Sequence, residues 1–179
     1  MKDIKEIFSK YSNKISNKEF LIYVNLVNQS ITLFKNFEKI KVYKISSSKY
    51  GEGGQEGSNK TPLGAHYIKE YIGKNEEIFT IFKNRKPTKN KTKTIKSEAC
   101  SKEDIISSRI LWLEGLENGK NKGEGVDSYS RYIYIHGTNE EGLLGKKASH
   151  GCIRMSNSDI IDMSKMDICN SIVYISNNK

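Results

Sequence analysis

Short apolar segments separated by polar turns recur along most of the chain, and this pattern is typical of β-strands. The segments are rich in Ile, Val, Phe and Tyr, which favour a pleated, half-buried surface. They lie at residues 20–24, 31–34, 40–45, 65–72, 78–82, 109–113, 132–135 and 171–176. The first three follow one another across turns of Asn, Gln, Ser and Lys, which predicts a β-meander. We therefore expect a mainly β protein.

Two segments have helical spacing instead. Near the N-terminus, apolar side chains recur every three or four positions over residues 3–11. A second helix is predicted to begin within residues 156–159, because Ser and Asp are typical of a helix start. The first helix is expected to be an appendage within residues 1–18, and residues 19–179 are expected to form a single domain.

Length and composition suit one domain with its own core, since the chain has 179 residues of which 36% are hydrophobic. No stretch approaches the roughly 18 apolar residues of a membrane span. The first residues lack the apolar region of a signal peptide, so we expect a cytoplasmic protein; a periplasmic or cell-wall location is the alternative if a signal peptide was removed. Three cysteines, an odd number, fit a reducing compartment, and Cys100 and Cys169 are expected to be free and structural.

The net charge of +9 is concentrated in one place, because residues 83–96 hold seven Lys or Arg and no acid. Such a run cannot build a core, and it predicts a solvated loop. A nucleic-acid-binding module is the alternative, but no aromatic side chain is interleaved with the basic ones and no recognition motif accompanies them. A further hypothesis is that this loop flanks an active-site groove and attracts peptide carboxylates.

The candidate chemistry lies in the run Ser149-His150-Gly151-Cys152-Ile153-Arg154, with His136 sixteen positions upstream of the cysteine and followed by Gly137. A thiol with its ordinary pKa of about 8.5 needs a base beside it to act as a nucleophile. Two of the three histidines lie here, each next to a glycine, which predicts a cysteine acyltransferase. Zinc is a weaker alternative, because no Cys-x-x-Cys or His-Glu-x-x-His spacing completes a site, and we expect no metal. The third histidine, His66, is expected to be structural.

Residues 131–155, from Arg-Tyr-Ile-Tyr-Ile-His-Gly-Thr to Ser-His-Gly-Cys-Ile-Arg-Met, resemble the catalytic signature of the L,D-transpeptidases, the YkuD-type domain of bacterial cell-wall enzymes. An upstream glycine-rich segment that ends in Thr61-Pro62-Leu63-Gly64 also resembles that family. The resemblance covers roughly residues 19–176. It implies a YkuD-like β-sandwich or barrel-like sheet with short peripheral helices, a catalytic cysteine on a loop at the mouth of a groove, and no cofactor.

The resemblance also implies the catalytic roles. Cys152 would attack a peptide carbonyl and form a thioester, and His136 would be the general base. The Gly137 carbonyl would orient the imidazole, so that no aspartate is required. The backbone N–H groups of Gly151 and Cys152 are candidates for the oxyanion hole. His150 is the second candidate base, because residues i and i+2 of an extended segment project to the same side. The alternative is that His150 supports the loop or binds the substrate.

Three further residues are candidates for substrate contact. Arg154 is assigned to the terminal carboxylate of the donor peptide, with a structural ion pair as the alternative. Ser149 is expected to hydrogen-bond within the loop, and Tyr134 to form a wall of the site.

The implied substrate is a tetrapeptide stem of peptidoglycan, free or in a muropeptide. It would be cut between the L-centre of the third, diamino acid residue and the terminal D-alanine. Water as the acceptor makes an L,D-carboxypeptidase of wall recycling, which fits the expected cytoplasmic location. The alternative is an exported L,D-transpeptidase that forms 3-3 cross-links or exchanges D-amino acids.

Overall fold

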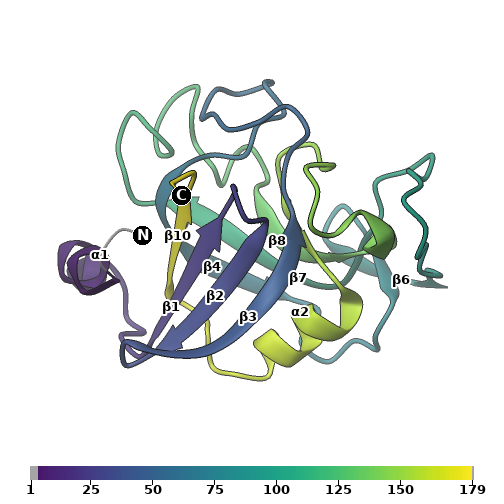
Figure 1. Ribbon diagram of the computed structural model, residues 1–179, viewed down its shortest axis with the longest axis horizontal. Coiled ribbons are helices and arrows are strands. Elements are labelled where there is room, and N and C mark those ends of the chain that lie inside the picture. The colour runs from purple at the N-terminus through teal and green to yellow at the C-terminus, as the bar shows by residue number, and fades with distance from the viewer. Residues whose placement is uncertain (1–3, 179) are drawn as a thin grey trace.

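The computed structural model describes residues 4–178 and contains ten strands and two α-helices (Figure 1). The helices are α1 (Ile4–Tyr11) and α2 (Asn157–Ser164), and two 3-10 turns lie at Ser12–Lys14 and Glu141–Leu143. The strands are β1 (Phe20–Asn25), β2 (Ser30–Lys35), β3 (Glu38–Ser46), β4 (Gly64–Ile72), β5 (Thr80–Lys83), β6 (Lys86–Lys91), β7 (Ile106–Gly115), β8 (Tyr134–Thr138), β9 (Ile153–Met155) and β10 (Ile172–Ser176). No helix in the described part of the chain has the length and apolar composition to cross a membrane.

The strands form one mixed sheet in the order β4-β10-β1-β2-β3-β9-β8-β7-β5-β6. β4 also pairs with β7, so the strands from β4 to β7 close on themselves, and the β5–β6 hairpin extends from β7. The pairs β1–β10 and β8–β9 are parallel, while the other pairs are antiparallel. This arrangement confirms the expected mainly β, barrel-like fold.

The largest apolar cluster fills the inside of this closed sheet and is covered by α2, which packs against β7 and β8. Ile160 and Met163 of α2 are fully buried in this cluster. The helix begins as predicted, because the Ser156 side chain accepts a hydrogen bond from the Asp159 backbone N–H at 3.0 Å. The short connection from β9 to α2 therefore anchors the strand that follows Cys152 against the core.

The N-terminal helix α1 packs on the outside of the sheet beside β1 and β10 (Figure 1). Its buried residues Ile4, Ile7 and Tyr11 share a second apolar cluster with residues of those strands. The predicted helix over residues 3–11 is thus confirmed from residue 4 onward, and its first residue lies outside the described part. The division into an appendage and a domain stays a prediction.

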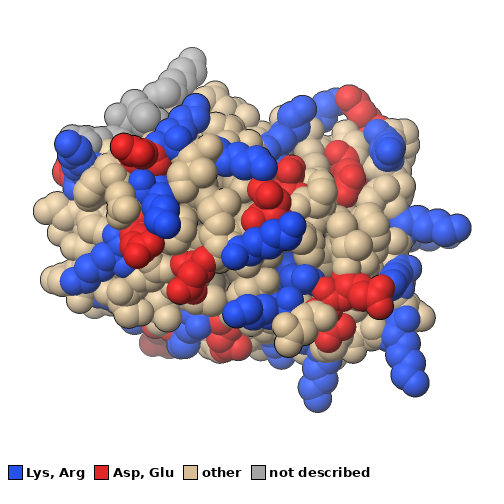
Figure 2. Space-filling view, turned by 90° about the horizontal axis from the view of Figure 1, so that it is seen from below, with Lys and Arg blue, Asp and Glu red and all other residues tan. Residues whose placement is uncertain are grey.

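The predicted loop is wrong for residues 86–91 of the basic run, which form β6, and holds for residues 92–96. The middle of the run forms β6 and the turn of the β5–β6 hairpin, because β5 pairs with both β6 and β7 and supplies partners for the backbone. The lysine side chains of β6 are exposed, as expected for a solvated surface. Figure 2 shows Lys and Arg interspersed with Asp and Glu on one face of the molecule, without a continuous basic patch there.

Candidate active site

Strand register brings the two principal catalytic candidates to one face of the sheet. In the parallel pair β8–β9, Ile135 lies opposite Ile153 and His136 opposite Arg154, and Cys152 directly precedes β9. Side chains alternate across a strand, so Ile135 and Ile153 enter the core while His136 and Cys152 share the other face. β8 begins two residues later than the strand predicted at 132–135 and extends past it, so His136 is the third residue of the strand. The reason is that Tyr132 has a φ of 56° and ends a turn.

The His136 imidazole is held in one tautomer by the chain itself. Its Nδ1 lies 2.8 Å from the Gly137 carbonyl oxygen, which can only accept, so Nδ1 carries the proton and Nε2 is left as the proton acceptor. A Cβ at Gly137 would lie 2.6 Å from the Ser107 carbonyl oxygen, so a side chain there would force the backbone that holds His136 to shift. Burial is the main reason that the pKa of His136 is below its ordinary value, although Asp104 and the Gly137 carbonyl oppose this effect. The imidazole is therefore neutral near pH 7.

The Cys152 thiol rests against the backbone of residues 132–134. Its Sγ donates to the Tyr132 carbonyl at 3.3 Å and accepts from the Tyr134 backbone N–H at 3.4 Å. The half-buried side chain packs against an apolar cluster that includes Trp112 and Tyr134, and burial raises the thiol pKa to about 12. The thiol and the imidazole are thus both neutral and lie on the same face of the sheet, so nucleophilic attack requires transfer of the thiol proton to a base.

A tight turn presents the cysteine. Gly151 has a φ of 128°, a conformation that L side chains rarely adopt, and the Ser149 hydroxyl donates to the Cys152 carbonyl at 2.6 Å. The Gly151 N–H donates to the Ser149 oxygen at 3.3 Å, so it is engaged within the turn and does not face outward as an oxyanion donor. The Cys152 N–H stays the candidate donor. Thr61 of the upstream segment donates to the Gly151 carbonyl at 2.9 Å, which joins the two sequence motifs.

His150 is directed away from the proton-transfer position. Its Nδ1 lies 3.2 Å from an Asp104 carboxylate oxygen, its ring centroid lies 5.9 Å from that of Tyr50, and 46% of its side chain is exposed. The turn at Gly151 means that residues 150–152 are not extended, so the premise for placing His150 and Cys152 on the same side is wrong. The geometry favours His136 as the base.

Arg154 is buried and forms ion pairs with two carboxylates through its two Nη atoms, while its buried Nε has no hydrogen-bond partner. Its Nη1 donates to Glu140 and its Nη2 to Asp104, both at 2.7 Å, and only 2% of the side chain is exposed. The structure thus shows the structural ion pair that was the alternative to a contact with the terminal carboxylate of the donor peptide, and Arg154 also lines a cavity of about 250 Å³ together with Asp104 and His150. Burial would raise the pKa of Asp104, but the nearby His136 and Arg154 hold it below its ordinary value.

The family model for the L,D-transpeptidase catalytic domain (YkuD) matches residues 19–174, which is most of the chain. This chain belongs to the L,D-transpeptidase family. The match contains Cys152, His136 and the upstream Thr61 segment in one unit. A comparison with curated proteins gives no match.

The fold of this L,D-transpeptidase domain is also that of solved family members. An L,D-transpeptidase from Mycobacterium smegmatis is 16% identical with a TM-score of 0.52, and the match covers 88% of this chain and 58% of that one. One from Mycobacterium tuberculosis is 13% identical with a TM-score of 0.54, covering 89% and 58%. L,D-transpeptidase 3 from Mycobacterium tuberculosis, in complex with a faropenem-derived adduct, is 13% identical with a TM-score of 0.54, covering 89% and 60%. The chain spans less than two thirds of the length of these proteins.

Cavities surround the turn residues of the L,D-transpeptidase site. One of about 300 Å³ is lined by Arg131, Tyr132 and His150 among others, and one of about 390 Å³ lies on the other side of Tyr132 against Tyr134. Tyr134 forms a wall, with its ring edge-on to Trp112 at a centroid distance of 5.5 Å. Tyr132, whose carbonyl accepts from the Cys152 thiol, lines both cavities.

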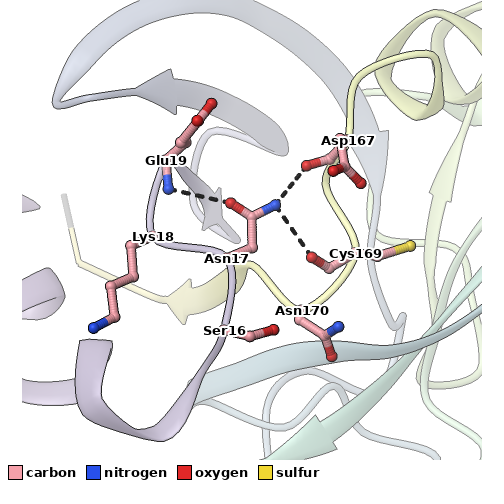
Figure 3. A pocket seen from close by; sticks show the side chains of 7 residues that line it. All are labelled: Ser16, Asn17, Lys18, Glu19, Asp167, Cys169 and Asn170. Carbon is pink, nitrogen blue, oxygen red and sulfur yellow. Dashed lines mark hydrogen bonds between the residues drawn. The ribbon is translucent and has the colours of Figure 1, made fainter.

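A separate cavity of about 380 Å³ has none of the catalytic candidates in its lining (Figure 3). There the Asn17 side chain donates to the backbone carbonyls of Asp167 at 2.5 Å and Cys169 at 3.2 Å, and accepts from the Glu19 N–H at 3.1 Å. These contacts clip the segment before β1 to the segment before β10. We assign this region a structural role.

Three residues important for the site escaped sequence reasoning. Asp104 and Glu140 surround Arg154, yet no motif marks either of them. Arg131 donates to the carbonyls of Gly54 at 2.7 Å and Lys60 at 2.8 Å, and so holds the glycine-rich segment against the site. Its place at the start of the family-like stretch was a usable signal.

The remaining histidine and cysteines make no contact with Cys152 or His136, although Cys100 lines a cavity with His150 and Arg154. His66 is fully buried with Nε2 2.9 Å from the Ser128 hydroxyl, and Cys100 and Cys169 are free. Within residues 4–178, no three His, Cys, Asp or Glu side chains are grouped so as to hold a metal ion.

Proposed function

We propose that this protein cleaves tetrapeptide stems of peptidoglycan through a thioester on Cys152, with His136 as the base. The observation that carries the proposal is the pairing of β8 with β9, which places a tautomer-fixed imidazole and a thiol on one face of the sheet. Membership of the L,D-transpeptidase family supports the substrate class.

The chemistry follows from the resting state of the two groups. Sγ attacks the carbonyl carbon on the L-centre side of the terminal D-alanine while its proton moves to His136 Nε2. The Cys152 N–H is placed to donate to the oxyanion. Collapse of the tetrahedral intermediate breaks the C–N bond, and the imidazolium returns its proton to the departing amine. The neutral starting pair means that no preformed thiolate is required.

We propose water as the second reactant, which makes the protein an L,D-carboxypeptidase acting in the cytoplasm on recycled wall peptides. His136 would take a proton from water, hydroxide would attack the thioester, and the thiol would leave with that proton. An amine acceptor would instead give 3-3 cross-links or D-amino acid exchange, which is the alternative. Fractionation of cells that express the protein checks the location.

Mass spectrometry of a defined tetrapeptide incubated with the protein tests the proposal. We expect the wild type to release one alanine and Cys152→Ala to release none. Cys169→Ala is the matched control, because that cysteine lines the structural cavity of Figure 3, and it should behave as the wild type. Addition of a D-amino acid decides the acceptor: exchange would replace the carboxypeptidase by the transpeptidase alternative. Retained turnover in Cys152→Ala would refute the mechanism.

A second measurement tests the nucleophile without the natural substrate. One similar structure holds a faropenem-derived adduct, so we expect faropenem to add to this protein as well. Intact-mass spectra should show one adduct on the wild type and on Cys169→Ala, but none on Cys152→Ala. An adduct on Cys152→Ala would place the reactive nucleophile elsewhere.

A further inference from the structure

The cavity of about 390 Å³ beside Tyr132 shares two residues with the surroundings of the nucleophile. It is lined by Asn84, Arg85, Ile106, Tyr132 and Tyr134. Two of these residues contact the Cys152 sulfur through their backbones, Tyr132 through its carbonyl at 3.3 Å and Tyr134 through its N–H at 3.4 Å. A group bound in this cavity therefore lies beside the reacting carbonyl of a peptide on Cys152.

Arg85 presents a guanidinium to this cavity. Its Cζ lies 4.8 Å from the ring centroid of Tyr132 and 5.1 Å from that of Trp112, and Tyr134 lines the same cavity. Aromatic rings pack against the flat face of a guanidinium, and its N–H groups, which point outward in the plane, then stay available to a carboxylate. Within residues 4–178, Arg85 forms no ion pair, whereas Arg154 is engaged with two carboxylates.

Both walls of the cavity have backbone conformations that bulky residues rarely adopt. Lys83 pairs with Lys86, so Asn84 and Arg85 form a two-residue hairpin loop with φ values of 49° and 65°. Such loops favour Asn-Gly, because both central residues need positive φ, and here arginine stands where glycine is preferred. Tyr132, in contact with Arg85, has a φ of 56°. Strain of this kind clusters at ligand sites.

We propose that this cavity is a carboxylate subsite in which Arg85 takes a carboxylate of the peptide substrate through paired N–H donors. The inference rests on the proposed function, and it moves the carboxylate contact from Arg154 to the β5–β6 hairpin. Two carboxylates of a stem peptide share this chemistry: the terminal carboxylate on the leaving residue, and a carboxylate on the acyl side of the scissile bond. The experiment distinguishes them by amidation of one or the other.

Binding is measured first, on a Cys152→Ala background that cannot turn over. The chain has a single tryptophan, and Trp112 lies against Arg85, so its fluorescence reports occupation of the cavity. We expect Arg85→Gln to weaken binding of the unmodified tetrapeptide roughly ten- to hundredfold, which is typical of a lost charged hydrogen bond. Lys89→Gln removes the same charge from an exposed position of the same hairpin and should bind as the parent does.

Amidated peptides then identify the carboxylate. Amidation at the contacted position should weaken binding to the parent and abolish the difference between the parent and Arg85→Gln, while amidation at the other position should leave that difference intact. Equal affinities of the two proteins for the unmodified peptide would overturn the subsite. A difference that persists when both carboxylates are amidated would overturn it as well.

Turnover by the otherwise wild-type enzyme separates this inference from the proposed function. If the enzyme cleaves the tetrapeptide and Arg85→Gln has the same KM, the function stands and the subsite is refuted. If the enzyme cleaves no stem peptide but binding still depends on Arg85, the subsite stands and the proposed reaction is refuted. We expect cleavage, with a raised KM and a nearly unchanged kcat in Arg85→Gln.

Discussion

Arg154→Gln should destabilise the fold rather than weaken a contact to substrate. The substitution removes the cation between Glu140, whose side chain is 5% exposed, and Asp104, whose side chain is 32% exposed. Breaking a buried ion pair by removing one partner costs about 3–5 kcal/mol, because the other charge is left uncompensated. Asp104 is partly solvated, so we expect the lower end, about 3 kcal/mol. For a protein of this size, this loss corresponds to a fall in Tm of roughly 6–12 °C.

Urea denaturation followed by Trp112 fluorescence measures this loss as a lower midpoint with an unchanged slope. Adding Glu140→Gln to Arg154→Gln should restore part of the stability, because the buried, unpaired carboxylate is then removed. Lys146→Gln is the control, since its ion pair with Glu98 has exposed partners (53% and 66%) and its loss should cost less than about 1 kcal/mol. An Arg154→Gln protein with the midpoint of the wild type and a raised KM for carboxylate-terminated peptides would refute this reasoning.

Three further predictions concern acid stability, the pH profile and the catalytic turn. Burial lowers the pKa of His66 from 6.5 to about 4, so its contribution to the free energy of unfolding is complete above pH 6.5, and about 3 kcal/mol is lost as the pH falls to 4. Urea titrations at both pH values should show a smaller loss of stability for His66→Gln than for the wild type. An equal loss in the two proteins would contradict the assignment. Asp104 raises the pKa of His136, so Asp104→Asn should move the acidic limb of the kcat/KM profile to lower pH. A limb that stays in place would exclude this effect of Asp104 on the base. Gly151→Ala should cost about 1 kcal/mol or more and abolish turnover, whereas Gly57→Ala, also at positive φ but in open space, should keep it; an active Gly151→Ala enzyme would show that the turn tolerates a side chain.

Much of the secondary structure could be predicted from local sequence patterns. The apolar segments predicted the positions of most strands, and the Ser-Asn-Ser-Asp sequence predicted the start of α2, because propensity and capping depend on residues a few positions apart. The Thr61 and Cys152 motifs were likewise visible as residues in order. Their contact, through Thr61 and the Gly151 carbonyl ninety positions later, could not be predicted from the residues themselves.

The misassigned elements have a common cause. The basic run was expected to be a loop because its side chains cannot form a core, yet a strand needs only partners for its backbone, and β5 supplies them. Arg154 was assigned to substrate because a guanidinium suits any carboxylate, but closure of the sheet places Asp104 and Glu140 against it first. Both outcomes depend on residues distant in sequence.

The chemical groups of this site can be read from the residues alone: a thiol, an imidazole with an adjacent carbonyl to fix its tautomer, and a glycine for the turn. Tertiary structure alone decided which groups these residues meet. The parallel pairing of β8 with β9 places His136 and Cys152 on one face and brings Arg154 next to His136, where it is buried between acids. The pairing of β5 with β7 brings Arg85 of the hairpin to a cavity that Tyr132 and Tyr134 also line. The physical reason is that side-chain chemistry and turn geometry are local, whereas strand register and burial are set by the closure of the whole sheet.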